Sequence, residues 1–195
     1  MIWFTSISIM FLLFIIPGLM AGLIDMIPAG DQPGYSVDSR ASIYRDRYFT
    51  QYFISKDKNL TAVATSIKNP NLKNKKNIIF NLYDDKNVLT RTTTLNGMNI
   101  EDGSFIKIIF EKIPDSKNKK YHFTLSSPDA GEEETIEVFL TGPTNEILNY
   151  IYDEVNKPGG TPMVTFHKPD SSPETIKLVY INWFSKLLPR HFQKI

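Results

Sequence analysis

The chain has 195 residues, 42% of them hydrophobic and 12% aromatic, with 22 Lys and Arg against 21 Asp and Glu, and it contains no cysteine. This length allows one domain with a buried core and short appended segments. A formal charge of +1 is too small for a protein that attracts nucleic acid through its charge, so we expect no nucleic-acid partner. The missing cysteines exclude disulfides, thiolate metal ligands and a cysteine nucleophile.

The first 24 residues carry no charged side chain, and their centre is the mostly apolar run Ile7–Ile16. About twenty such residues are enough to cross a bilayer as a helix. Pro17 and Gly18 interrupt the run, which a transmembrane helix tolerates better than a soluble helix does. We therefore predict that residues 1–27 form a transmembrane anchor or a signal segment.

Two features bear on the cleavage and the orientation of this segment. It has neither a basic start nor small residues in the spacing of a cleavage site. The first basic residues, Arg40, Arg45 and Arg47, follow it and weakly favour a cytoplasmic position for that flank. We favour an uncleaved, single-pass anchor in the cell membrane with the rest of the chain extracytoplasmic. A cleaved signal peptide stays open as the alternative.

Residues 28–47 are rich in Pro, Gly, Ser and Asp at their start and are predicted to form a linker. From residue 48 onward, apolar and polar residues alternate, which is typical of strands. Eight strands are predicted, at residues 48–53, 60–67, 77–83, 88–95, 104–110, 120–126, 135–140 and 162–167. Many short strands without long helices between them favour an antiparallel sandwich or barrel over residues 48–170.

The apolar positions of these strands define a predicted core. We expect these side chains to be buried together: Phe80, Leu82, Ile108, Phe110, Tyr121, Phe123, Leu125 and Val138. Residues 144–156 depart from the strand pattern, because their apolar residues recur at a helical spacing behind Thr144, a helix-capping residue type. A helix is therefore predicted over that segment.

Residues 171–195 are predicted to form an amphipathic helix and a tail. Ser172, Pro173 and Glu174 supply a hydroxyl cap, a first-turn proline and an acid near the positive end of the helix dipole. Two interpretations stay open: the helix docks on the sandwich, or it lies in a membrane interface. We expect a contact surface for a membrane or a protein partner, formed by Trp183, Phe184, Leu188 and Arg190.

Residues that could support catalysis or bind a metal are scattered along the chain. The histidines His122, His167 and His191 are not spaced as metal ligands, and His122 is predicted to be exposed on a sheet face. The acids of Asp84–Asp85 point to opposite faces of a strand end, and those of Glu132–Glu134 lie in a loop. We therefore predict no catalytic residue, no metal site and no cofactor.

The stretch Phe110–Ala130 carries a more specific pattern. It contains a strand end, a polar turn and a second strand in which Tyr121, Phe123 and Leu125 alternate before a Ser-Pro stop. This hairpin resembles the corresponding hairpin of jelly-roll, carbohydrate-binding-module-like (galactose-binding-like) domains in bacterial cell-envelope proteins. The segment Tyr48–Phe53, with the segments that follow it up to Asp84, is similar to the start of such domains.

The resemblance spans about residues 48–167 and implies a domain outside the membrane. Such domains are often attached to polytopic membrane glycosyltransferases. With this resemblance, the predicted fold class is all-β: an antiparallel jelly-roll-type β-sandwich with an N-terminal transmembrane helix and a C-terminal amphipathic helix.

Three functions fit this sequence. The favoured one is a membrane-anchored, extracytoplasmic β-sandwich that acts as a non-catalytic binding or accessory module, with cell-envelope carbohydrate or a polytopic membrane protein as partner. The alternative is a structural or assembly subunit that contacts another membrane protein. The third is a glycan-active hydrolase, whose two carboxylates the sequence does not pair.

Overall fold

The structure is a computed structural model that describes residues 2–187. The chain divides into two compact units. One unit is formed by Met1–Ile27 together with Lys168–Ile195, and the other by Pro28–His167. The first unit is helical, and the second contains the two β-sheets.

The N-terminal part of the helical unit is a run of three adjoining helical segments. These are α1 (Ile2–Met10), the π-helical turn η1 (Phe11–Ile15) and α2 (Ile16–Leu23). A transmembrane helix was predicted here, but none of the helices between residues 2 and 187 is long and apolar enough to cross a membrane. The helical run of residues 2–23 exposes many apolar side chains: Ile7, Ile9, Met10, Phe11, Leu12, Ile15, Leu19 and Leu23.

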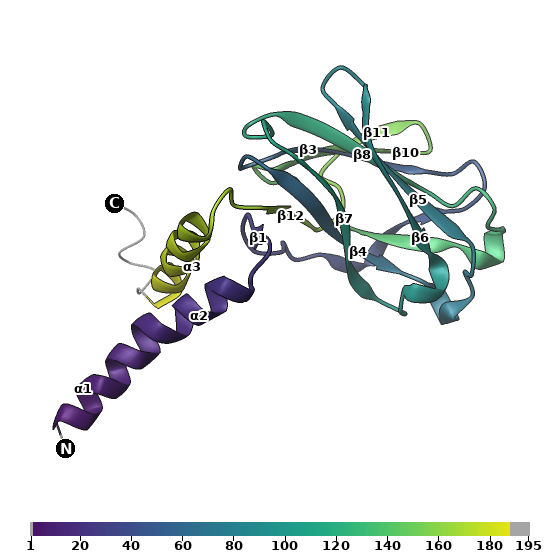
Figure 1. Ribbon diagram of the computed structural model, residues 1–195. Helices are drawn as coiled ribbons and strands as arrows, with labels where there is room; N and C mark the ends of the chain where they lie inside the picture. Colours follow the sequence, from purple (N-terminus) through teal and green to yellow (C-terminus); the bar gives the residue numbers. More distant parts are fainter. Residues whose placement is uncertain (1, 188–195) are drawn as a thin grey trace. The chain divides into compact units, whose positions relative to one another are not determined.

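The predicted C-terminal helix is present as α3 (Ser172–Leu187). Ser171 caps it, one residue before the predicted cap, because its Oγ accepts the backbone N–H of Glu174 at 3.4 Å. The helix lies beside α2, an arrangement that neither sequence interpretation included (Figure 1). Tyr180 of α3 comes close to Gly18 of α2, because a Cβ added at Gly18 would lie 3.6 Å from the Tyr180 hydroxyl oxygen.

The second unit is a β-sandwich of two antiparallel sheets (Figure 1). The first sheet has the strand order β1-β12-β4-β9-β2, with β7 also paired to β4, and the second has the order β11-β10-β3-β8-β5-β6. Within the described residues the strands are β1 (Ile27–Pro28), β2 (Ser36–Ile43), β3 (Phe49–Ile54), β4 (Leu60–Lys68), β5 (Asn77–Asp84), β6 (Leu89–Asn96), β7 (Ser104–Ile113), β8 (Lys120–Ser126), β9 (Ile136–Leu140), β10 (Ile147–Tyr152), β11 (Val155–Pro158) and β12 (Met163–His167). Three short 3-10 turns join them: η2 (Pro70–Leu72), η3 (Gly97–Asn99) and η4 (Glu132–Glu134).

The core lies between the two sheets, as the alternation of apolar residues predicts. All eight predicted strands form, and all eight predicted core side chains belong to one buried cluster. Aromatic rings fill its centre: the ring centroid of Phe123 lies 6.1 Å from that of Phe53 and 5.3 Å from that of Phe80. Each of these three rings is fully buried.

The segment predicted as a linker contains a strand. The sandwich unit begins at Pro28, and β2 occupies Ser36–Ile43 within the predicted 28–47 linker. The first five residues of β2 are exposed, and only Ala41 and Ile43 of this strand are fully buried. Because one half of the strand contributes nothing to the core, its sequence shows no apolar alternation.

The helix predicted over residues 144–156 is wrong. This segment forms the hairpin of β10 and β11, and β10 pairs with β3. Asp153 and Glu154 reverse the chain with φ angles of 49° and 62°. A two-residue turn with positive φ twists in the sense that a hairpin needs, but it usually contains Gly or Asn. The acidic pair therefore gave no turn signal, and the fortuitous spacing of the apolar residues favoured a helix.

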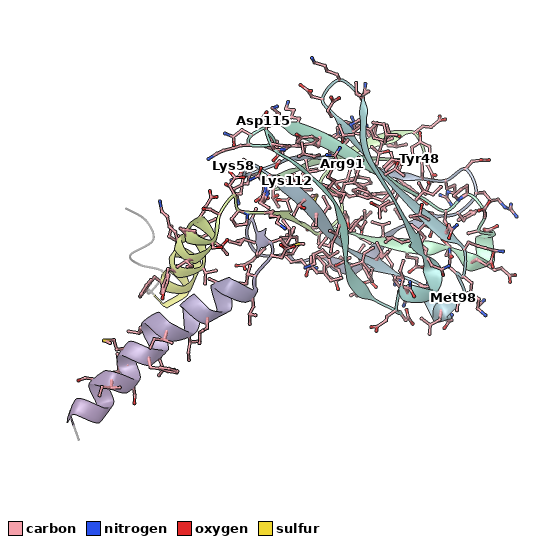
Figure 2. The ribbon with its side chains drawn as sticks, viewed as in Figure 1. Tyr48, Lys58, Arg91, Met98, Lys112 and Asp115 are labelled. Atoms are coloured by element: carbon pink, nitrogen blue, oxygen red, sulfur yellow. The ribbon has the colours of Figure 1, made fainter. Side chains whose placement is uncertain are left out.

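Arg91 of β6 links the edge strand of the second sheet to β7, an edge strand of the first sheet. Its guanidinium donates to the carbonyl oxygens of Glu111 and Lys112 in β7, at 2.8 and 3.1 Å (Figure 2). These two carbonyls lie where the register between β4 and β7 is irregular. The contact satisfies backbone groups that an edge strand would otherwise offer to another chain.

Replacing Phe123 with alanine should lower the free energy of unfolding by about 3–5 kcal/mol, because a fully buried ring is lost from the centre of the core. Thr94→Ala, at an exposed position of β6, is the control and should change it by less than about 0.5 kcal/mol. Chemical denaturation of the two variants in parallel measures both effects. Similar losses in the two variants would contradict the assignment of the buried face.

Candidate functional site

The candidate site is the outer face of the second sheet, the side that points away from the core. On this face the side chains of neighbouring strands form rows. Tyr52 of β3 lies opposite His122 of β8, which lies opposite Tyr83 of β5. These outward positions alternate with the buried Phe53, Phe123 and Leu82, so the aromatic row follows from the same alternation that builds the core.

The three rings of this row stack on one another. The ring centroid of His122 lies 4.9 Å from that of Tyr52 and 4.8 Å from that of Tyr83, with interplanar angles of 26° and 5°. Because the rings stack along the row, they present their edges to the solvent. The row therefore offers polar edge atoms, namely the two phenol hydroxyls and the imidazole nitrogens.

His122 is outward-facing as predicted, but the prediction that it is exposed is wrong. Only 9% of this residue is accessible, because a tyrosine ring covers each face of the imidazole. Burial lowers the pKa of His122 below its ordinary value, and Asp84 offsets part of that effect. The ring is therefore neutral at pH 7, with one nitrogen as donor and the other as acceptor.

A second row runs beside the aromatic one and is purely polar. Thr50 of β3 lies opposite Thr124 of β8, which lies opposite Asn81 of β5, and Asn81 in turn faces Thr92 of β6. The Thr92 hydroxyl donates to the amide oxygen of Asn81, and the amide nitrogen of Asn81 has no hydrogen-bond partner among the described residues. Neither row contains a charged side chain.

These rows have hydrogen-bonding capacity that the protein itself does not use. Within residues 2–187, the hydroxyls of Tyr52, Tyr83 and Thr124 have no hydrogen-bond partner, and no buried side-chain polar atom is left unsatisfied. The unpaired groups therefore reach the solvent. An uncharged surface of hydroxyls, amides and ring edges suits a ligand that is itself uncharged and rich in hydroxyl groups.

The contact surface predicted on the C-terminal helix is only partly covered by the described residues. Phe184 lies in α3 and is 38% exposed. Trp183 belongs to the same helix, but its side chain is outside the described part of the chain, as are Leu188 and Arg190. The role of these four residues stays a prediction.

Three other polar residues singled out in the sequence, His167, Asp84 and Glu134, have local structural roles, and His191 lies outside the described residues. His167 is buried, and its ring nitrogens contact the Lys58 carbonyl at 3.0 Å and the Thr165 hydroxyl at 3.2 Å. The Asp84 carboxylate accepts hydrogen bonds from backbone N–H groups of the turn that follows it. The Glu134 carboxylate accepts a hydrogen bond from the backbone N–H of Gly131. Among the described residues, no three His, Asp or Glu side chains come together as a metal site.

Sequence reasoning missed the aromatic row, although part of its signal was present. Alternation placed His122 on the outward face of its strand. Its juxtaposition with Tyr52 and Tyr83, however, requires that β3 and β5 flank β8, and these strands lie far apart in the sequence. A single sequence does not specify that order.

Acidification should destabilise the protein through His122. Its folded-state pKa is below the unfolded value of about 6.5, so the unfolded state binds the proton first and stability falls as the pH drops below about 6.5. Burial also lowers the pKa of His167, so His167 likewise makes the folded state less stable as the pH falls. In His122→Phe the loss of unfolding free energy between about pH 7 and pH 5 should be smaller, as denaturation at each pH would measure. An NMR titration that gives His122 an ordinary or raised pKa would contradict this.

No protein-family model matches this chain, and no curated protein matches it either. The choice between the functions that fit the sequence therefore rests on the geometry and the chemistry of the sandwich.

Proposed function

We propose that the protein is a membrane-anchored, extracytoplasmic module that binds an uncharged cell-envelope glycan on the outer face of its second sheet, without catalysing a reaction on it. The observation that carries this proposal is the pair of uncharged rows centred on His122 and Thr124, with hydroxyl and amide groups that have no partner within the described residues. The resemblance of the Phe110–Ala130 hairpin to those of carbohydrate-binding jelly-roll domains supports the same ligand class.

The chemistry of the face favours a glycan over other partners. A sugar chain offers many hydroxyls that both donate and accept, and each such hydrogen bond contributes about 0.5–1.5 kcal/mol. A charged ligand would find no counter-ion in either row, although it would have to give up part of its hydration. Several strands contribute to the rows, so an extended chain can contact more than one sugar unit.

The proposed anchor is the helical run of residues 2–23. It contains no charged residue, and it is continuous from α1 through the π-helical turn to α2. At about 1.5 Å per residue, it extends about 33 Å, against about 30 Å for the hydrocarbon core of a bilayer. Its exposed apolar side chains support burial in lipid.

A second candidate function, that of a subunit in a membrane-protein assembly, is favoured by α3. This helix exposes the apolar side chains Ile176, Ile181 and Phe184, at 39%, 52% and 38% of their accessible area. Exposed apolar surface on a helix is typical of a contact with lipid or with another protein. The two functions are compatible, because they use different units of the chain.

The double variant Tyr52→Phe, Tyr83→Phe tests the glycan site. It removes two hydroxyls that have no partner in the described protein, so thermal stability should be unchanged. Loss of two ligand hydrogen bonds should weaken glycan binding by about tenfold. Tyr48→Phe, which removes an exposed hydroxyl just before β3, serves as the control and should bind normally.

Binding would be measured calorimetrically, with neutral and acidic oligosaccharides in parallel. Preference for acidic chains, or full affinity in the double variant, would contradict the proposed site.

Alkaline carbonate extraction tests the anchor. The full chain should stay in the membrane pellet, whereas a chain that starts at Pro28, where the sandwich unit begins, should be released. Ile9→Lys with Leu12→Lys should also release the protein, because each central charge costs about 2.5–3.5 kcal/mol in a membrane helix. Leu12→Ala is the neutral control. Release of the unmodified chain would mean that residues 2–23 are not an anchor.

A further inference from the structure

A shallow, open cavity of about 440 Å³ lies at one rim of the sandwich, and none of its lining residues belongs to the two rows of the outer face. Its wall comes from the start of β2, the end of β9, the middle of β10 and the end of β11. Pockets that bind small molecules have volumes of about 300–1,000 Å³. The side chains that matter for its chemistry are Tyr35, Ser36, Ser39, Thr141 and Tyr150.

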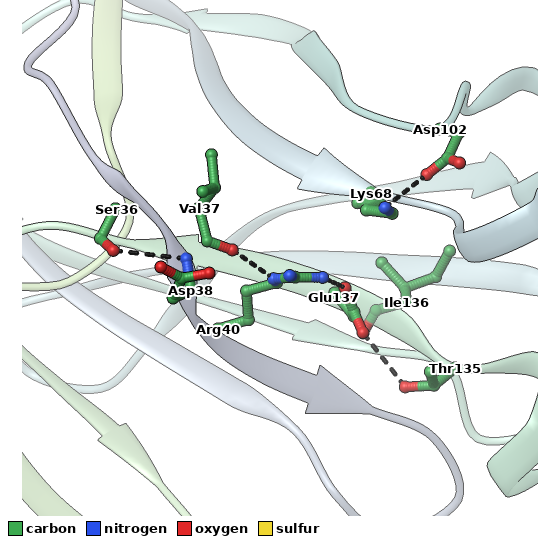
Figure 3. Close-up of polar contacts among 9 residues, drawn as sticks. All are labelled: Ser36, Val37, Asp38, Arg40, Lys68, Asp102, Thr135, Ile136 and Glu137. Atoms are coloured by element: carbon green, nitrogen blue, oxygen red, sulfur yellow. Dashed lines mark hydrogen bonds and ion pairs between the residues drawn. The ribbon is translucent and has the colours of Figure 1, made fainter.

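An irregularity of β2 shapes the mouth of this cavity. Ser36 pairs with Leu140 and Arg40 with Phe139, so three residues of β2 have no partner in β9. Arg40 holds this bulge in place: its Nε donates to the Val37 carbonyl at 2.6 Å, and its Nη1 contacts Glu137 at 2.5 Å (Figure 3). Bulges are frequent beside functional sites, where they redirect side chains.

Tyr150 contributes a polar group to the cavity from inside the core. Its ring stacks on Phe49 with the ring centroids 5.5 Å apart, and only 8% of the residue is accessible. Within the described residues its hydroxyl has no hydrogen-bond partner, and no buried side-chain oxygen is unsatisfied. The hydroxyl is therefore the part of Tyr150 that meets the solvent in the cavity. Burial raises the pKa of Tyr150, so the phenol stays protonated and can donate.

The remaining wall is uncharged and has an aromatic side. Tyr35 is 43% exposed, and its ring packs on Phe139 with the centroids 4.8 Å apart. The Ser39 hydroxyl has no hydrogen-bond partner in the described part of the chain. The Thr141 hydroxyl donates a hydrogen bond to the Gly34 carbonyl oxygen at 2.6 Å. The lining thus combines a ring face, free hydroxyls and no charge.

We propose that this rim cavity is a second binding site, which takes one uncharged, polyhydroxylated ring of monosaccharide size. The hydroxyls of Tyr150 and Ser39 hydrogen-bond the hydroxyls of the ligand, and the Tyr35 ring packs on its carbon face. Arg40 is a positioning residue that holds the bulge open. The ligand is either a free monosaccharide or the terminal unit of a longer glycan. The site does not depend on the outer face, because it shares no residue with the two rows.

The test uses the full chain in a detergent without a sugar headgroup. Glucose, galactose, N-acetylglucosamine and glucuronate would be titrated by saturation-transfer NMR and by calorimetry. At least one neutral sugar should bind saturably, and glucuronate should bind more weakly. Tyr150→Phe should weaken binding about fivefold to tenfold with an unchanged melting temperature, because the lost hydroxyl has no partner within the described protein.

Two further variants decide where a bound sugar sits. Tyr35→Ala should also weaken binding of the monosaccharide, whereas Tyr48→Phe, which removes an exposed hydroxyl outside both proposed sites, should leave it intact. The proposal is overturned if no neutral monosaccharide binds, if Tyr150→Phe binds normally, or if only the outer-face double variant Tyr52→Phe, Tyr83→Phe loses binding. A longer chain ending in the same sugar identifies the source when it is titrated into this outer-face double variant, which weakens the other proposed site. Equal affinity then indicates a terminal unit, and exclusion of the longer chain indicates the free sugar.

Discussion

The packing of aromatic rings between the two sheets is the constraint on which the other features of the sandwich depend. The ring of Phe123 lies in the middle of the core, with its centroid 6.1 Å from that of Phe53 and 5.3 Å from that of Phe80. Side chains on a strand alternate between its two faces, so burying these rings fixes what the opposite face presents. The outward row of Tyr52, His122 and Tyr83 is therefore a consequence of core packing, and a register shift of one residue would destroy both.

The rim cavity has a related origin at the place where the core ends. Tyr150 belongs to the buried cluster through its ring, which stacks on Phe49, while its hydroxyl is left at the boundary. The bulge of β2 between Ser36 and Arg40 lies at the same rim, and residues of the bulge and Tyr150 line the same cavity. A phenol can serve both environments, since one end of it is apolar and the other is polar.

The two units differ in where their apolar side chains lie. The sandwich turns its apolar side chains inward and presents polar rows, whereas the helical run of residues 2–23 keeps many apolar side chains exposed. Exposed apolar surface of this extent is typical of a contact with a membrane or with another protein. The membrane-anchored, glycan-binding module that we propose would account for both patterns.

Periodicity along the chain was enough to predict the eight alternating strands, eight of the buried core residues and a helix within residues 171–195. It did not reveal the half-exposed strand β2 or the hairpin of β10 and β11, where periodicity is absent or misleading. The candidate sites were decided by tertiary structure alone. Tyr52, His122 and Tyr83 meet only because β8 pairs with β3 and β5, and Tyr150 lines a cavity only because β2 and β10 reach the same rim. Such neighbours depend on hydrogen bonding between strands far apart in the sequence, which local residue patterns do not encode.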